Sequence, residues 1–596
     1  MSQSVQSLPK THKSGVQSML SGADIVVRSL VQHGVTNMFA YPGGFTIPLH
    51  QALTRYRDKI RVILPRHEQG GGFGAQGIAR STGELGVCMV TSGPGATNLL
   101  TAIADAKLDS IPLLAICGQV ATNSIGYDAF QETPITEVCR SITKHHCLIT
   151  DVKDVARLMK EAIYVATTGR PGPVLVDIPK DVQTAQCLAN FDIPMTLPGY
   201  SGDIPQITDA EIKTVADAIR AAKRPVLYVG GGVIAADAAA ELLKLVEKTQ
   251  IPVTTTLTAL SSFPREHPCS IGMPGMHGTV YANYAIAESD LLIAIGVRFT
   301  DRVTGKVNEF AKNAKIVHVD IDPSEINKIK QTDTAIVSDA AYFLTKLNRV
   351  VTQPDADLTQ WRSKIDEWKK RYPLHYATSS DHIVPQQAVE ELWKATKDRD
   401  TIITSGVGQH QMWTAQFYKF KTPRTWLTSG GLGTMGFGLP AAMGAKAANP
   451  DKLVVNVDGD GSLQMNIQEM GACFCEKLPV KVMLLNNQHL GMVVQWEDRF
   501  YASNRGNTYL GPIDHPEVTG QGVGIGPEVR YPDFCGIARG YGWQARLVSK
   551  PEELADAVRE MTESDAPFLL DVTVPYQEHV LPMIPAGGTV QDIILG

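Results

Sequence analysis

The sequence predicts an α/β protein made of three domains, each built on a doubly wound parallel sheet. Short apolar runs recur along the chain and alternate with stretches of helical periodicity. The runs are continuously apolar, as are strands that helices cover on both faces. Several runs end in glycine-rich or polar turns, and open α/β sheets bind ligands at that carboxyl edge. A chain of 596 residues is also too long for a single hydrophobic core.

Shifts in composition mark the expected boundaries. Residues 1–20 form a polar N-terminal tail. A Pro/Gly-rich stretch at residues 197–202 reads as a linker between a first domain, residues 21–195, and a middle domain, residues 205–375. The last domain then occupies residues 385–596, and its Gly/Pro-rich segment 511–530 reads as a long loop.

Bulk properties exclude several classes of function. The chain is 43% hydrophobic and 19% charged, which is typical of a globular protein with large cores. A net charge of −6 offers no basic footprint for nucleic acid. No apolar run reaches the ~18 residues of a membrane span, and the N-terminus has no apolar signal-peptide core. The nine scattered cysteines favour a reducing compartment, so we expect a cytoplasmic protein.

In the first domain, one acid stands out. The expected strands are the apolar runs 62–64, 87–90, 113–116 and 174–176, and Glu68 follows the first of them where a helix should begin. A carboxylate there is usually a helix N-terminal charge that the helix dipole favours. The alternative is a buried acid that exchanges a proton with a heterocycle. Position alone favours the structural role.

The middle domain has three strand-like runs with informative ends. Run 225–229 leads into three glycines, run 291–295 into Gly296, and run 316–319 into Asp320. Glycine-rich strand ends can cradle a pyrophosphate, and an Asp after a strand can accept a ribose hydroxyl. The strict Gly-x-Gly-x-x-Gly pattern is missing, so tight structural turns explain the glycines equally well.

The last domain contains an expected strand–helix–strand unit. The apolar run 453–457 ends in Asp-Gly-Asp-Gly-Ser, and the run 480–485 ends in Asn-Asn. Between them we expect one helix that presents Leu463, Ile467 and Met470 on one face. Both polar turns therefore lie at the carboxyl edge of the predicted sheet.

These two turns carry the residue types of a magnesium–phosphate site. Asp460 offers a carboxylate, Asn487 an amide oxygen, and His489 a backbone carbonyl. With water and two phosphate oxygens they would complete an octahedral Mg²⁺ site. Gly459 and Gly461 let the backbone approach a diphosphate closely.

Gly-Asp-Gly followed by Asn-Asn at this distance resembles the thiamine-diphosphate signature. Residues 65–70, 91–98 and 169–174 resemble the catalytic subunit of the acetohydroxyacid synthase (acetolactate synthase) family, and residues 276–278 and 296–302 resemble its flavin-binding middle domain. The resemblance implies two related outer domains with the thiamine-diphosphate-binding fold and a Rossmann-like middle domain.

The resemblance also implies a function. Pyruvate would be decarboxylated on thiamine diphosphate and condensed with a second pyruvate or with 2-oxobutyrate. The product would be 2-acetolactate or 2-aceto-2-hydroxybutyrate, in valine, leucine and isoleucine biosynthesis. The implied cofactors are thiamine diphosphate, Mg²⁺ and FAD, with FAD required but not a net redox partner. The implied assembly is a homodimer or homotetramer with active sites between subunits, and the family also uses a separate small regulatory subunit.

Residue roles follow from the same resemblance. Glu68 would promote the reactive tautomer of the cofactor's aminopyrimidine, and Arg302 would hold the acceptor's carboxylate. Trp496 would favour 2-oxobutyrate as acceptor. The implied catalytic residues are Glu68, Gln131, Lys180, Arg302, Met492 and Trp496. The implied thiamine-diphosphate contacts are Tyr41, Gly43, Glu68, Val407, Gly408, Gln409, His410, Gly433, Met435, Gly459, Gly461 and Ser462. The implied FAD contacts are Arg170, Gly230, Gly231, Gly232, Met276, His277, Gly278, Gly296, Arg298, Asp320 and Asp339. The implied substrate pocket is Gly44, Phe130, Arg302 and Trp496, and the implied metal ligands are Asp460, Asn487 and His489.

Two other kinds of enzyme compete with this interpretation. The first is another thiamine-diphosphate enzyme, such as a pyruvate oxidase or a 2-oxo acid decarboxylase. The second is a flavin oxidoreductase that uses the middle domain alone, which would leave Glu68 and the Asp460/Asn487 pair without a task. A binding module without catalysis fits least, because three polar constellations stand at strand ends.

Overall fold

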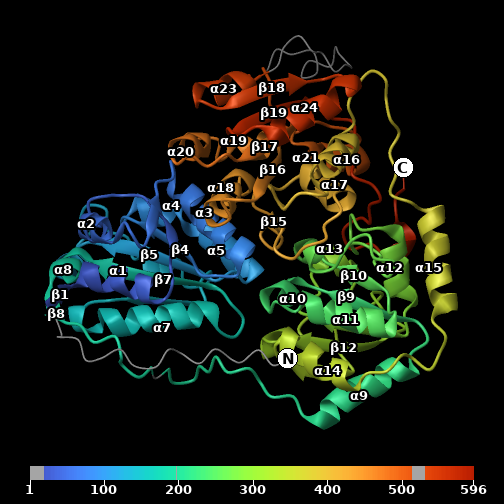
Figure 1. Cartoon of the computed structure of the whole chain (residues 1–596), viewed down its shortest axis with the longest axis horizontal. Coiled ribbons are helices and arrows are strands. Elements are labelled where there is room, and N and C mark those ends of the chain that lie inside the picture. The colour runs from blue at the N-terminus through green and yellow to red at the C-terminus, as the bar shows by residue number, and fades with distance from the viewer. Residues whose placement is uncertain (1–18, 196, 513–530, 596) are drawn as a thin grey trace.

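The computed structural model describes residues 19–195, 197–512 and 531–595. The chain forms three parallel sheets with helices on both faces, as the sequence predicts (Figure 1). The first domain lies at the left of Figure 1, the middle domain at the lower right and the last domain at the top. Most of the predicted N-terminal tail and of the predicted loop 511–530 lies outside the described residues.

The first domain holds six parallel strands in the order β3-β2-β4-β5-β7-β6. Its strands are β2 (Asn37–Ala40), β3 (Arg61–Ile63), β4 (Gly86–Val90), β5 (Leu113–Gln119), β6 (His145–Leu148) and β7 (Pro173–Pro179). Its helices are α1 (Gly22–Gln32), α2 (Ile47–Leu53), α3 (Glu68–Thr82), α4 (Pro94–Asn98), α5 (Leu100–Asp109), α6 (Ile135–Val138), α7 (Val155–Thr167) and α8 (Lys180–Thr184). A short antiparallel pair, β1 (Met19–Ser21) and β8 (Gln186–Leu188), closes the domain.

The middle domain has five parallel strands in the order β10-β9-β11-β12-β13. Its strands are β9 (Pro225–Val229), β10 (Val253–Thr255), β11 (Leu291–Ile295), β12 (Lys315–Asp320) and β13 (Thr334–Val337). Its helices are α9 (Asp209–Ala221), α10 (Gly231–Ala235), α11 (Ala239–Thr249), α12 (Val280–Glu288), α13 (Asp301–Thr304), α14 (Ala340–Val350) and α15 (Thr359–Arg371).

The last domain repeats the topology of the first, with the order β15-β14-β16-β17-β19-β18. Its strands are β14 (Thr401–Ser405), β15 (Trp426–Thr428), β16 (Leu453–Gly459), β17 (Lys481–Asn486), β18 (Gln544–Val548) and β19 (Phe568–Thr573). Its helices are α16 (Pro385–Thr396), α17 (Gln409–Phe417), α18 (Gly438–Ala448), α19 (Asp460–Gln464), α20 (Glu469–Cys475), α21 (Gly491–Phe500), α23 (Phe534–Gly540) and α24 (Pro551–Glu563). In both outer sheets the chain reverses its direction of travel between the second and third strands of this order, which creates a topological switch point.

The single helix expected after the Gly-Asp-Gly turn is wrong. The chain forms two short helices, α19 and α20, with a turn between them. The buried side chain of Asn466 lies in that turn, and its Nδ2 donates to the Gly436 carbonyl at 2.8 Å. This bond to another loop draws Asn466 out of the helical path.

Helices α3 and α18 pack the two outer domains together without side chains between them. A Cβ added to Gly77 would lie 2.1 Å from the Ala441 carbonyl oxygen, and one added to Gly444 would lie 1.8 Å from that of Gly74. The rings of Phe73 and Phe437 meet edge to face beside this contact, with centroids 5.5 Å apart. Only glycine permits so close an approach of two helix backbones, which accounts for Gly77 of α3 and Gly444 of α18.

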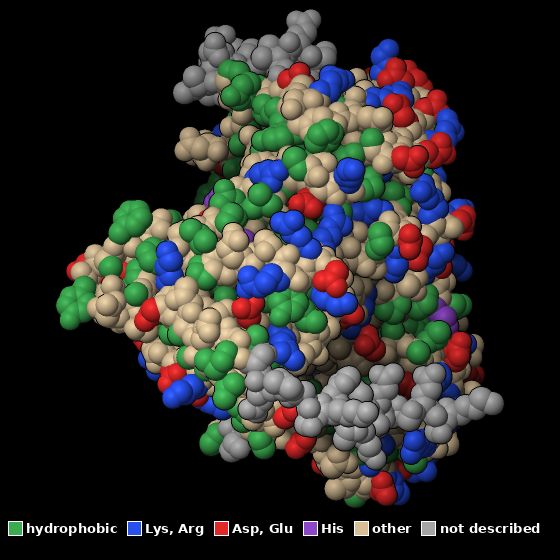
Figure 2. All heavy atoms as spheres, turned by 60° about the vertical axis from the view of Figure 1, so that its left-hand side comes forward, with side chains coloured by type: hydrophobic (Ala, Val, Ile, Leu, Met, Phe, Trp, Pro, Cys, Tyr) green, Lys and Arg blue, Asp and Glu red, His purple; other side chains and the backbone are tan. Residues whose placement is uncertain are grey.

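The surface carries mixed charge. On the face drawn in Figure 2, Lys and Arg side chains lie among Asp and Glu side chains. Among the helices of the described residues, none is both long and apolar enough to cross a membrane.

Candidate active site

Asp460 lies at the switch point of the last sheet. It is the first residue of α19 and directly follows β16. Its side chain is buried, and this burial raises the pKa of Asp460 to about 8. Burial penalises the carboxylate form, and a divalent cation beside the oxygens would favour that form again.

Asn487 and His489 supply further oxygens beyond the end of β17. The side-chain oxygen of Asn487 accepts the His489 N–H at 3.0 Å, and the His489 carbonyl accepts the Gly491 N–H at 2.8 Å. The side-chain oxygen of Asn487 keeps a second lone pair. A carboxylate, an amide oxygen and a backbone carbonyl are hard ligands of the kind that Mg²⁺ prefers.

The glycines beside Asp460 leave room that a side chain would fill. A Cβ added to Gly459 would lie 2.6 Å from His410 Nδ1, and one added to Gly461 would lie 2.8 Å from Leu490 Cδ2. The chain can therefore present its backbone N–H groups at the start of α19 to an anion. The oxygen donors and this cradle together fit a diphosphate held through Mg²⁺.

The loop after β14 faces the same switch point. His410 Nε2 lies 3.2 Å from Asp458 Oδ1, and both side chains are buried. Gln409 donates to the Gln495 side chain at 3.1 Å and to the Glu578 carbonyl at 2.9 Å. The amide nitrogen of Gln409 is thus held by the protein. The remaining predicted thiamine-diphosphate contacts of this domain are Val407, Gly408, Gly433, half-buried Met435 and Ser462, whose Oγ accepts the Gly436 N–H at 3.0 Å.

Glu68 is the first residue of α3 and is half-buried at the carboxyl edge of the first sheet. Asn98 Nδ2 donates to its Oε2 at 3.0 Å. Among the described residues, no hydrogen bond reaches the other oxygen, Oε1. The position satisfies the helix-dipole role and leaves Oε1 able to exchange a proton with a ligand.

Other predicted residues lie on the same edge of the first sheet. Tyr41, Gly43 and Gly44 follow β2, and Lys180 follows β7 with its Nζ 5.8 Å from the Phe45 ring centroid. Phe130 is 82% exposed, and Gln131 adopts a left-handed φ of 61°.

A cavity of about 790 Å³ lies where the three domains meet. Its walls come from α5 and the loop after α7, from the strand ends of the middle sheet, and from the loops after β14 and β15. The predicted FAD residues that line it are Arg170, Gly230, Gly231, Gly232, Met276, His277, Gly296, Arg298, Asp320 and Asp339; Gly278 does not. Val407, Gly408 and Gly433 line the same cavity, but Glu68 and Asp460 do not.

Three charged residues of this cavity have partners within the protein. Arg170 pairs with Asp322 at 3.0 Å and with Glu325 at 2.6 Å, and this pairing joins the first and middle domains. Burial raises the pKa of Asp320 to about 6. Asp339 caps α14 through its Oδ1, which accepts the N–H groups of two following residues, while its Oδ2 has no bond to a described residue.

The predicted acceptor residues border the same cavity. Met492 and Trp496 lie one turn apart on α21 and both line it, as the i, i+4 spacing predicts. Arg302 also lines it from α13, with a side chain that is 65% exposed and pairs with Asp301 at 2.9 Å. An exposed guanidinium with so weak a partner is available to a carboxylate ligand.

Comparisons with known proteins agree with this arrangement. The family models that match are the N-terminal TPP binding domain of thiamine pyrophosphate enzymes at residues 20–141, their central domain at 212–347 and their C-terminal TPP binding domain at 406–572. Acetolactate synthase 1, chloroplastic, of Zea mays is 54% identical over 580 residues, which cover 96% of this chain and 88% of that protein. Acetolactate synthase 3, chloroplastic, of Brassica napus is 53% identical over 96% of this chain and 86% of its own, and acetolactate synthase, chloroplastic, of Arabidopsis thaliana is 52% identical over 96% and 84%.

The chain belongs to the acetolactate synthase family. Each matched segment falls within one of the three domains, although the first ends before β6 and β7 and the third begins just after β14. The matches name both outer domains as thiamine pyrophosphate-binding. In this acetolactate synthase family member the candidate cation ligands and Glu68 stand on different sheets of one chain, and none of them lines the three-domain cavity.

One residue beside this acetolactate synthase site escaped the sequence analysis. Glu469, the first residue of α20, is fully buried, and its carboxylate accepts the N–H groups of Arg66 and His67 at 3.0 Å each. The last domain thus holds the turn that precedes Glu68. A Cβ added to Gly70 would lie 2.3 Å from Glu469 Oε1, so the glycine leaves space for the carboxylate. An acid between apolar helix residues was the available signal.

Glu469→Gln should lower kcat about tenfold, because losing one hydrogen bond to a charged group costs ~1.5–3 kcal/mol and loosens the turn before Glu68. The KM for pyruvate should change little. Burial raises the pKa of Glu469 from 4.5 to about 7, so between these values the folded protein binds more protons than the unfolded chain and its stability falls as pH rises. Denaturant unfolding measured between pH 4.5 and about 7 should show this fall in the free energy of unfolding in the wild type but not in Glu469→Gln.

Glu476→Gln is the matched control for that variant. Its carboxylate also reaches the first domain, in an exposed ion pair with Arg61 at 3.4 Å. An exposed pair contributes little to stability. Equal kcat values for Glu469→Gln, Glu476→Gln and the wild type would show that Glu469 does not position the turn.

Proposed function

We propose that the protein is an acetolactate synthase catalytic subunit that condenses pyruvate with a second pyruvate or with 2-oxobutyrate. Membership of the family is the single observation that carries the proposal. The site supports it: hard oxygen ligands and a glycine cradle at the last switch point, a three-domain cavity for FAD, and an available arginine beside it. Thiamine diphosphate, when bound, supplies the electron sink for the decarboxylation.

The chain's own residues would bind, orient and move a proton. Asp460, Asn487 and the His489 carbonyl would hold Mg²⁺ on the diphosphate. Glu68 would exchange a proton with the cofactor's pyrimidine ring through Oε1, while the bond from Asn98 fixes Oε2. Arg302 would orient the acceptor's carboxylate with its planar guanidinium. The apolar walls from α21 would exclude water.

The decisive assay uses purified protein with pyruvate, thiamine diphosphate and Mg²⁺, with and without FAD. The proposal expects acetolactate and a requirement for FAD. Oxygen-dependent turnover that releases peroxide would instead assign a pyruvate oxidase. Free acetaldehyde as the main product would assign a 2-oxo acid decarboxylase.

Trp496 offers a test of acceptor choice. Its ring packs on Phe500, with centroids 5.0 Å apart, and borders the cavity. Trp496→Leu should reduce the preference for 2-oxobutyrate over pyruvate about tenfold, since a pocket distinguishes one methylene by ~1–3 kcal/mol. Competition between the two acceptors, with both products quantified, measures the ratio.

Val493→Ala is the control for Trp496→Leu. Val493 lies on the same helix but is 47% exposed and is not among the residues that line the cavity. If Trp496→Leu and Val493→Ala both kept the wild-type product ratio, Trp496 would have no part in acceptor choice.

We further propose an assembly of at least two chains, as a homodimer or homotetramer with active sites between subunits. Glu68 and Asp460 belong to different sheets, and exposed aromatic side chains, Tyr127 at 79% and Phe130 at 82%, lie near the Glu68 edge. Large exposed apolar side chains favour a protein interface. A small regulatory subunit is the second proposed partner, and co-purification of the complete enzyme tests both.

The cytoplasm is the compartment we propose. The nine cysteines suit reducing surroundings, since none forms a disulfide among the described residues. The relatives are called chloroplastic, so a plastid is the alternative, and a C-terminal fluorescent fusion distinguishes the two.

A further inference from the structure

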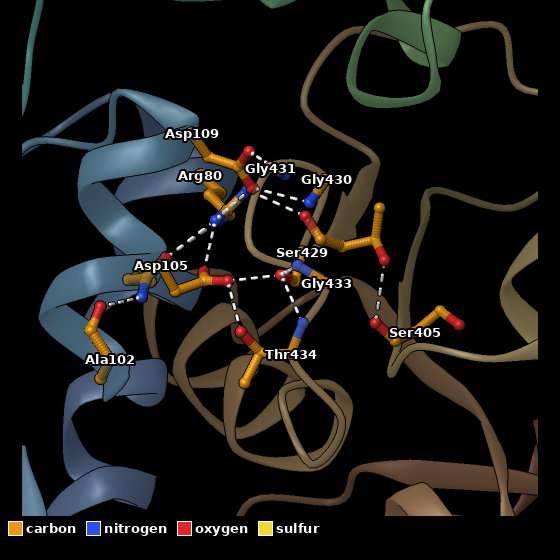
Figure 3. A network of polar contacts seen from close by, with 12 residues as sticks. Arg80, Ala102, Asp105, Asp109, Ser405, Ser429, Gly430, Gly431, Gly433 and Thr434 are labelled. Atoms are coloured by element: carbon orange, nitrogen blue, oxygen red, sulfur yellow. Dashed lines mark hydrogen bonds and ion pairs between the residues drawn. The ribbon is translucent and has the colours of Figure 1, made fainter. Parts of the chain in front are cut away.

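A buried ionic cluster of the first domain meets a loop of the last domain beside the cavity (Figure 3). Arg80 on α3 pairs with Asp105 at 3.0 Å and with Asp109 at 2.9 Å, both on α5. The side chains are 8%, 0% and 2% exposed. Gln76 fixes the guanidinium through its Oε1, which accepts the Arg80 NH2 group at 2.8 Å.

The cluster has one positive and two negative groups, so one carboxylate is left without a cation of its own. Loop 429–434 supplies the missing donors. Asp109 accepts the backbone N–H groups of Gly430 at 2.9 Å and Gly431 at 2.7 Å. Asp105 accepts the hydroxyls of Ser429 and Thr434. A buried carboxylate is tolerated only when such bonds satisfy it, so the loop and the cluster stabilise each other.

Ser429 is the central residue of the loop. While its Oγ donates to Asp105, the same oxygen accepts the N–H groups of Gly433 at 3.1 Å and Thr434 at 2.9 Å. Arg80 adds a bond to the Thr428 carbonyl at 2.9 Å, just before the loop. The loop therefore closes on itself only while Asp105 holds the serine hydroxyl in place.

The same loop touches the middle domain. A Cβ added to Gly430 would lie 2.3 Å from Thr258 Cγ2, and one added to Gly431 would lie 3.0 Å from an Arg298 nitrogen. Gly433 lines the cavity, and Met435, an implied thiamine-diphosphate contact, is the first residue after the loop. One short segment thus borders both proposed cofactors.

We propose that Asp105 is a positioning residue that, with Arg80 and Asp109, fixes loop 429–434 in the conformation that both FAD and thiamine diphosphate require. The inference rests on the proposed function for the identity of the two ligands. Binding of either cofactor would then depend on a first-domain residue that is not among the lining residues of the cavity. The two affinities should weaken together when the cluster is disturbed.

Asp105→Asn tests this with little change in volume. The variant should bind FAD about tenfold more weakly, as flavin fluorescence titration measures, because the loop's hydroxyls lose a charged acceptor. The thiamine diphosphate concentration for half-maximal activity should rise by a similar factor. Ser429→Ala leaves the Arg80 pairs intact but removes the loop's hydroxyl, and it should reproduce both shifts.

The double variant distinguishes a loop anchor from a general loss of stability. If Asp105 acts through Ser429, the combined variant should bind FAD no more weakly than the worse single variant. Ser81→Ala is the matched control, because Ser81 follows Arg80 on α3 and accepts a bond from Asn449 of the last domain at 3.1 Å. It should bind both cofactors as the wild type does.

FAD affinities of Asp105→Asn and Ser429→Ala within twofold of the wild type would overturn the inference, as would fully additive effects in the double variant. Those titrations read flavin binding directly. A wild type that binds FAD but makes no acetolactate would instead overturn the proposed function and leave the loop anchor to be judged by the fluorescence data.

Discussion

Glu68→Gln is expected to lower kcat by about 100- to 10,000-fold, the usual contribution of a positioned general acid or base. Glutamine keeps the size of the side chain and can accept the bond from Asn98, but it cannot exchange a proton through Oε1. Binding of FAD and of thiamine diphosphate should remain within a few-fold of the wild type. Steady-state acetolactate formation and fluorescence titration measure the two effects separately.

Glu84→Gln is the control for removing a negative charge near α3. Glu84 lies just beyond the end of α3 and is exposed. Full activity in Glu68→Gln would contradict a thiamine mechanism on this chain and support the flavin oxidoreductase that uses the middle domain alone.

Asp460→Asn is expected to abolish binding of thiamine diphosphate at millimolar Mg²⁺, with loss of activity to background. The amide is a weaker ligand than a carboxylate, and it carries no charge to balance the cation. In the wild type, burial raises the pKa of Asp460 to about 8, so the cation must displace a proton below that pH. Mg²⁺ affinity should therefore rise as pH increases toward about 8 in the wild type, and calorimetry at several pH values measures it.

Asp556→Asn, an exposed change on α24 of the same domain, should keep both the affinity and its pH dependence. A Mg²⁺ affinity of the wild type that stays flat from pH 6 to about 8 would contradict the protonated state of Asp460 in the metal-free protein.

Mixing the two inactive variants tests the proposed assembly. If each site takes Glu68 from one chain and Asp460 from another, Glu68→Gln and Asp460→Asn chains refolded or co-expressed together should regain activity. A hybrid dimer would hold one site with both residues intact. No recovery in a mixture shown to contain hybrids would place both residues of a site on one chain.

The parallel sheets were predictable because each buried strand can be recognised from its own short stretch of sequence, a continuous apolar run that ends in polar residues. The relation between the two outer domains was expected only from the family resemblance, and their matching strand orders establish it. The break between α19 and α20 was not predictable, since it depends on a bond from Asn466 to a loop thirty residues away in the chain. Helix propensity depends on residues that are close in sequence, so it does not reveal a hydrogen bond to a distant loop.

The proposed site residues followed from the family resemblance and its motifs, and the residues that we propose position them did not. Glu469 and Asp105 carry no motif of their own, and each accepts hydrogen bonds from another domain, from residues more than three hundred positions away along the chain. Sequence can signal that an acid is surrounded by apolar residues. It cannot show which backbone N–H groups that acid will accept.

The contact between α3 and α18 also limits how the molecule can move. Where two backbones touch directly, as at Gly77 and Gly444, the helices cannot slide or tilt past each other without a clash. The two outer sheets therefore have to move as one rigid body. The middle domain is joined in sequence to its neighbours through residues 197–208 and 372–384, and it contacts them through polar bridges such as Arg170–Asp322 and Arg424–Asp237 and through the buried side chains of Leu260 and Met273.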